Sequence, residues 1–125
     1  MTRKEFEAIV AEEVDAIPDR FLRELANVVF VVEDEPSAEQ LEENGVLPEE
    51  TLLGLFEGVM LGERGSGPWE LPGRIIVFRH PTEDEAEESG MSVREVIRDT
   101  VWHEVAHYLG MEEYEVRGAE ERRKR

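Results

Sequence analysis

The segment HEVAHYLGMEEYE, which begins at His103, carries the residues of this chain that are best suited to chemistry. His103 and His107 are four residues apart, and Glu104 directly follows the first histidine. On a helix, histidines at positions i and i+4 lie on one face and can present two imidazole nitrogens to one zinc ion. A glutamate after the first histidine can reach a water at the metal and act as its general base. The spacing therefore indicates a catalytic zinc site.

A third metal ligand is expected beyond the second histidine. Gly110 stands where the helix would end in a left-handed residue, which would let the chain turn back toward the metal. The spacing after this glycine favours Glu113 as the acidic ligand, with Glu112 and Glu115 as alternatives. Together with the two histidines, Glu113 would leave one position open for water, which is the arrangement of catalytic rather than structural zinc sites.

Two histidines packed in a core are the alternative explanation of this motif. From the chain's own composition, the pattern HExxH would arise somewhere by chance with a probability of about 1–2%. Apolar residues surround the second half of the helix, so we expect this half to be buried all round, with His103, Glu104 and His107 as its strongly polar groups. A buried glutamate needs a partner or a nearby cation. Zinc would be that cation, which favours the metal site.

Four further residues near the motif could contribute to such a site. His80 ends a predicted strand and could lie on the substrate side or be an outer partner, although a histidine at a strand end is more often simply exposed. Tyr108 and Tyr114 could donate hydrogen bonds to an oxyanion, but packing is the simpler role for both. Met111 is expected to fill the core.

The helix that carries the motif can be placed from its two ends. Ser92 and Glu95 form a capping box, and Gly110 marks the other end, so the predicted helix spans residues 93–109. The other elements are predicted from hydrophobic periodicity and from turn residues. They are helices at 2–17 and 18–25, strands at 27–32, 51–61 and 74–80, a polar surface segment at 33–50, a Gly- and Pro-rich segment at 62–73 and an acidic connector at 81–90.

Composition limits the classes of protein that this chain can be. Its 125 residues fit one domain, spanning 1–125, and with no cysteine it can form neither a disulfide nor a thiolate metal site. The formal net charge of −17 disfavours nucleic acid and anionic membrane as partners. The sequence shows no secretion signal and no stretch of membrane-spanning length, so the expected location is cytoplasmic.

The sequence resembles the small bacterial zinc metallopeptidases known as minimal zincins. The segments LPEETLLGLFEGVML, LPGRIIVFRHP and IRDTVWHEVAHYLGMEEYE follow in the order and spacing of that family, and DAIPDRFLRELANVVFVVEDEP is similar to its N-terminal portion. The resemblance implies an α/β (α+β) zincin-like fold, with a short mixed sheet packed on helices and the metal site on the last long helix. It also implies His103 and His107 as zinc ligands, Glu104 as the base, and Glu113 as third ligand in place of the family's usual aspartate.

The expected function is that of a zinc metallopeptidase, which cleaves peptide bonds in a peptide or protein substrate with activated water. The strand at 74–80 could pair with an extended peptide as an edge strand, and the segment at 62–73 could border the cleft as a lid. The alternative is a metal-bound interaction module with little or no turnover, against which the presence of Glu104 argues. A metal-dependent RNA hydrolase is disfavoured by the negative charge.

Overall fold

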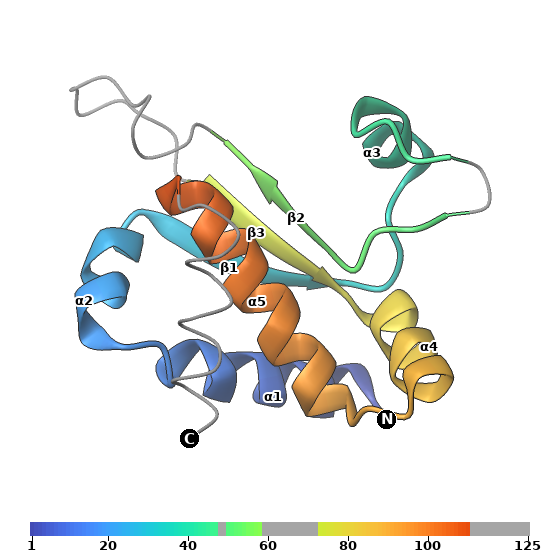
Figure 1. Ribbon diagram of the computed structural model, residues 1–125, viewed down its shortest axis with the longest axis horizontal. Coiled ribbons are helices and arrows are strands. Elements are labelled where there is room, and N and C mark those ends of the chain that lie inside the picture. Colours follow the sequence, from blue (N-terminus) through green and yellow to red (C-terminus); the bar gives the residue numbers. More distant parts are fainter. Residues whose placement is uncertain (48–49, 59–72, 111–125) are drawn as a thin grey trace.

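The computed structural model describes residues 1–47, 50–58 and 73–110 of the chain. Within this part, a three-stranded sheet in the order β1-β3-β2 packs against helices (Figure 1). Its strands are β1 (Val28–Glu33), β2 (Gly54–Glu57) and β3 (Gly73–Phe78). β1 runs parallel to β3, whereas β2 runs antiparallel to it. The expected α+β fold with a short mixed sheet is confirmed.

Three of the described helices begin where a short polar side chain caps the backbone. Thr2, Ser37 and Ser92 each accept a hydrogen bond from the backbone N–H three residues later, in a complete capping box. The last helix ends at Gly110, whose φ of 76° is left-handed and suits glycine. The helical elements are α1 (Arg3–Asp15), α2 (Asp19–Leu22), the 3-10 helix η1 (Arg23–Leu25), α3 (Ala38–Glu43), α4 (Arg79–Ser89) and α5 (Val93–Leu109).

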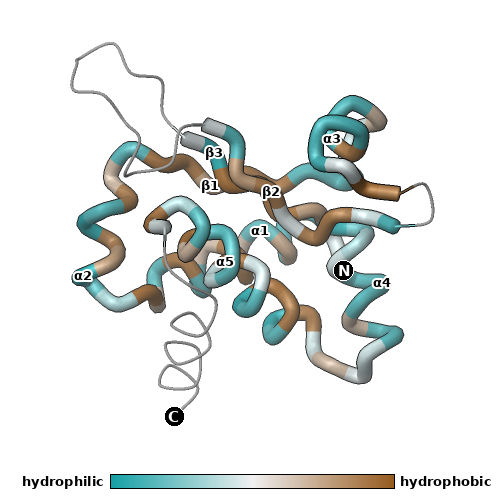
Figure 2. The backbone as a smooth tube through the Cα atoms, turned by 45° about the horizontal axis from the view of Figure 1, so that its top comes forward, coloured by the Kyte–Doolittle hydropathy of each residue, from teal (hydrophilic) through white to brown (hydrophobic). Residues whose placement is uncertain are grey.

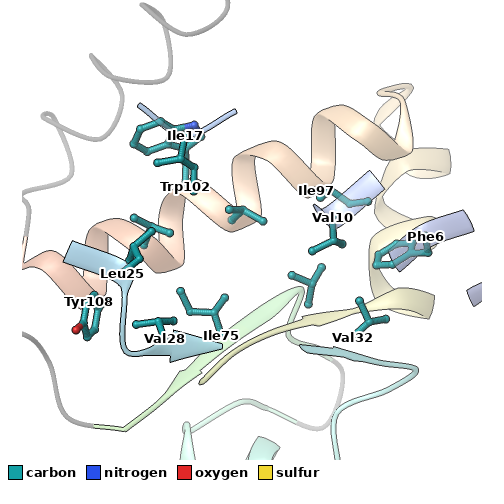
Figure 3. Packing of buried hydrophobic residues seen from close by; sticks show 13 residues of the cluster. Phe6, Val10, Ile17, Leu25, Val28, Val32, Ile75, Ile97, Trp102 and Tyr108 are labelled. Atoms are coloured by element: carbon teal, nitrogen blue, oxygen red, sulfur yellow. The ribbon is translucent and has the colours of Figure 1, made fainter. Parts of the chain in front are cut away.

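The main hydrophobic core lies between one face of the sheet and helices α1 and α5 (Figure 3). Trp102 is fully buried there and makes an edge contact with Phe21, with ring centroids 5.5 Å apart. The other buried members come from α1, the α1–α2 turn, η1, the two neighbouring strands and α5: Phe6, Val10, Ile17, Leu25, Val28, Val32, Ile75, Val77, Ile97, Val101, Val105 and Tyr108. This packing fixes α5, the helix that carries the histidine motif, against the sheet.

A smaller apolar cluster covers the opposite face of the sheet. It consists of buried Leu55, Ile76 and Phe78, with the partly buried Val31 and Leu52 packed against them. The central strand β3 is therefore buried on both faces, which explains why its sequence is a nearly continuous apolar run (Figure 2).

Helices α1 and α5 are also joined by a charged cluster. Glu13 of α1 is 5% exposed, and its carboxylate lies 2.9 Å from Arg94 and 2.8 Å from Arg98, both on α5. The hydrogen bond with Glu13 raises the pKa of each of the two arginines. Both guanidinium groups compensate the charge of this deeply buried carboxylate.

Several boundaries differ from the sequence predictions. The strand expected at 74–80 ends at Phe78, and the next two residues open α4, so the segment expected to be an acidic connector is a helix. The polar segment at 33–50 contains α3, and the strand expected at 51–61 is limited to β2 within the described residues. The segment expected to be a lid lies outside them up to residue 72. In the part of the chain that the structure describes, no helix has the length and apolarity needed to cross a membrane.

Candidate metal centre

The three residues of the histidine motif lie in one open cleft between α5 and β2. His103, Glu104 and His107 line this cleft, which has a volume of about 860 Å³. On α5, Asp99 and Thr100 continue the same wall toward the start of the helix. The remaining described residues of the lining come from β2 and the segments before it: Asn44, Leu52, Leu53, Gly54, Leu55 and Phe56.

Both histidines are exposed in the cleft, which corrects the expectation that this half of α5 is buried all round. The expectation does hold for their neighbours Trp102, Val105 and Ala106, which are fully buried. The histidines differ from these neighbours because β2 is the edge strand of the described sheet. The face of α5 that bears the histidines therefore lines the open cleft beside β2. The imidazole rings lie with their centroids 4.3 Å apart. Two donors therefore stand side by side and are accessible to an ion.

Glu104, in contrast, is only 9% exposed although it lines the same cleft. Burial raises the pKa of its carboxyl group because the charged form loses its hydration, while the positive charge of His107, when present, acts in the opposite direction. The carboxylate Oε2 lies 3.8 Å from Nδ1 of His107, which is beyond hydrogen-bonding distance. A cation held by the two histidines would offset the cost of burying this charge.

Gly54 is a part of the cleft whose role the sequence alone did not reveal. It lies where β2 passes close to α5, and a Cβ atom built on it would come within 2.5 Å of Thr100 Cγ2 and 3.4 Å of Glu104 Cγ. The sequence placed this glycine within the strand predicted at 51–61 and gave it no role in the site. Glycine inside a strand also marks a close approach of another backbone or side chain, and that signal was available.

The donor set in the cleft fits zinc. Paired imidazoles on one helix, with a carboxylate one residue after the first, are ligands and a base of the types found in catalytic zinc sites. Among the described residues, no group of three histidine, cysteine, aspartate or glutamate side chains is gathered to hold a metal ion. Glu113, the expected third ligand, lies outside the described residues, as do the alternatives Glu112 and Glu115.

The remaining candidates fall outside the cleft or outside the described residues. His80 lies in the first turn of α4, and its Nδ1 is 3.2 Å from Glu35 Oε1, so it does not join the other two histidines. Tyr108 is buried and packs on Phe56 with ring centroids 5.2 Å apart, in keeping with the packing role expected for it. Met111 and Tyr114 are not described by the structure.

Residues 25–122, which include the whole motif, match the sequence pattern of the zincin-like metallopeptidases. The chain belongs to the zincin-like metallopeptidase family. This match confirms the resemblance seen in the sequence, and it agrees with the mixed sheet and with the position of the motif on the last long helix.

A solved structure has the same fold as this zincin-like chain. It is a conserved hypothetical protein from Thermus thermophilus, which is similar with a TM-score of 0.61 and 20% sequence identity over 87% of this chain and 94% of that one. No curated protein matches the chain. Family membership and fold therefore rest on independent comparisons, of sequence and of structure.

Proposed function

We propose that this protein is a zinc-dependent peptide hydrolase in which Glu104 is the general base. The observation that carries the proposal is that the side chain of Glu104 is buried while the two histidines that line the same cleft are exposed. A helix that served only for packing would not bury an acid beside two accessible imidazoles. Membership of a metallopeptidase-like family supports the same reaction class.

Each residue of the motif has a distinct task in this proposal. His103 and His107 would hold the ion through their imidazole nitrogens, and Glu113 would be the third ligand. Zinc, when bound, supplies Lewis-acid activation of water and of a carbonyl group. Glu104 takes a proton from the attacking water and returns it to the leaving amine.

The edge of the sheet beside Glu104 gives a peptide substrate a place to bind. The sequence had suggested the strand at 74–80 for this role, but β3 is central and pairs with both other strands. β2 instead lies at the sheet edge within the described residues, and its residues line the cleft. An extended peptide could hydrogen-bond to this edge and place its scissile bond near Glu104.

Replacing Glu104 by glutamine tests the proposal. The amide keeps the shape of the side chain but cannot accept a proton from water, so we expect zinc to stay bound and cleavage to fall by about 10²–10⁴-fold. The measurements are metal content and cleavage rate on a peptide selected from a library. Glu88→Gln is the matched control, because Glu88 is an exposed residue of α4 that does not line the cleft.

Three outcomes would contradict part of this assignment. Full activity of Glu104→Gln with zinc retained would exclude Glu104 as the base. Loss of zinc from the same variant would make it a ligand or a structural partner of the histidines. A wild-type protein that binds zinc and cleaves no peptide would instead favour a metal-bound interaction module.

A further inference from the structure

The two walls of the cleft approach each other closely at Gly54. A side chain there would meet Thr100 Cγ2 at 2.5 Å and the carbonyl oxygen of Ile76 at 3.3 Å, both shorter than ordinary van der Waals contact. Thr100 lies one helical turn before Glu104, and it is 7% exposed. β2 and the turn of α5 that carries the base therefore touch at a position that has no room for even one methyl group.

Both β2 at Gly54 and the side chain of Thr100 are restrained by their surroundings. β2 is held to β3 by its antiparallel pairing, in which Gly54 lies opposite Val77, and the N–H of Phe78 donates to the carbonyl of Leu53 at 2.9 Å. Thr100 is β-branched and helical, so its side chain has few alternative rotamers. An atom added at Gly54 therefore has to be accommodated by a shift of β2 away from α5 or by a change of rotamer at Thr100, which is only 7% exposed.

We propose that Gly54 is a positioning residue that sets the width of the cleft at Glu104. Its φ is not positive, so the backbone does not require glycine, and the lack of a Cβ serves the close approach alone. This inference rests on the proposed function, since a scissile bond held by β2 must come within hydrogen-bonding reach of Glu104. A misplacement of about 1 Å between a reacting group and its catalyst can lower a rate about 100-fold.

The test is a cycle of Gly54→Ala and Thr100→Ser, made singly and together. Serine lacks Cγ2, the atom closest to the added methyl group, but it keeps the hydroxyl group. We expect Gly54→Ala alone to lower the Tm of the metal-free protein by about 4 °C or more, and Thr100→Ser to recover at least half of this loss in the double variant. We expect kcat/KM for the test peptide to fall about 10- to 100-fold and to recover in parallel, with zinc affinity unchanged because both histidines lie on α5.

Gly73→Ala is the matched control, because it overpacks a strand of the same sheet at a position that does not contact Thr100. Gly73 lies on β3, and a Cβ there would meet the ring of Phe56 at 2.7 Å, so this variant should lose stability as well. Thr100→Ser should not restore it, because the two residues do not share this contact. Recovery of the Gly73→Ala variant by Thr100→Ser would mean that the serine stabilises the protein in general, and it would overturn the inference.

Measurements of Tm and of cleavage rate together distinguish a failure of the positioning role from a failure of the proposed function. Equal loss of Tm by Gly54→Ala with and without Thr100→Ser would show that the contact does not set the spacing. If the double variant recovers its Tm but the cleavage rate is the same in all variants, Gly54 has no positioning role. The proposed function would remain intact in that case. If the wild type binds peptides without cleaving them, the proposed function fails, and peptide affinity then replaces the rate as the readout, with the same loss and recovery expected.

Discussion

The three histidines of the chain provide an internal comparison for the metal site. His103 and His107 lie side by side in the cleft, whereas His80 is on α4 and contacts Glu35. We expect His103→Ala and His107→Ala each to lose the bound zinc, because each removes one imidazole donor. His80→Ala should retain about one zinc per chain. Metal content after dialysis measures all three variants, and stoichiometric zinc in the double alanine variant of the cleft would place the site elsewhere.

The third zinc ligand is expected to be Glu113 rather than its neighbour Glu112. Gly110 is left-handed, as the sequence predicts for a chain that turns at the end of α5. We expect Glu113→Ala to weaken zinc binding more than Glu112→Ala, because the spacing after this turn favours Glu113. Competition with a chelator gives the two affinities under the same conditions. Equal or reversed effects would show that Glu113 is not the ligand.

The buried carboxylate of Glu13 makes a prediction about how α1 is held to α5. Glu13→Ala removes the carboxylate that accepts hydrogen bonds from both Arg94 and Arg98, so it should lower the free energy of unfolding by about 1.5–3 kcal/mol, the typical contribution of hydrogen bonds to charged groups. Glu12→Ala is the matched control. Glu12 is the preceding residue and is exposed, and its contact with Arg94 at 3.4 Å is screened by solvent, so its loss should change the stability little. Denaturant unfolding measures both, and similar values for the two variants would contradict a special role for Glu13.

Elements with local signals were predictable, and elements that depend on tertiary contacts were not. The capping box at Ser92 gave the start of α5, because a cap is formed by neighbours in sequence. The helix α4 was missed because its sequence is almost entirely polar and acidic. Its burial rests on few residues, among them Thr82 and Ala86, which lie four positions apart. The left-handed Gly90 at its end was a signal that could have been used.

The candidate site was predictable in its residue types but not in its surroundings. Spacing alone placed His103, Glu104 and His107 on one helix, and the structure brings all three to one cleft. Which side of α5 is covered depends on where the sheet ends, and no local pattern contains that information. The exposure of the histidines and the close approach of Gly54 to Thr100 therefore emerged only from the fold.

The charge of the whole molecule predicts which peptides are preferred. The net charge is −17, and the described residues that line the cleft include Asp99 and Glu104 but no lysine or arginine. A negative electrostatic potential around the protein raises the local concentration of positively charged ligands. We expect kcat/KM for a lysine-flanked peptide to exceed that for the same peptide flanked by glutamate by about tenfold or more at low ionic strength.

Ionic strength provides the control for this charge effect. Because salt screens long-range interactions, the ratio of kcat/KM between the two peptides should shrink as salt rises from about 0.01 M to about 1 M. A ratio that does not change with salt would mean that the peptides are distinguished by contacts within the cleft rather than by the overall charge.

The parallel pairing of β1 with β3 has a consequence for the order in which the molecule forms. Val28 lies opposite Gly73, so this pairing closes a long loop, whereas β3, α4 and α5 follow one another directly in sequence. Contacts between distant segments form later because their loop-closure entropy must be overcome first. As synthesis proceeds from the N-terminus, α1 and β1 leave the ribosome before β3 and α5, the elements that cover their apolar faces, have been made. We therefore expect β3, α4 and α5 to form their mutual contacts before α1 and β1 pack against them.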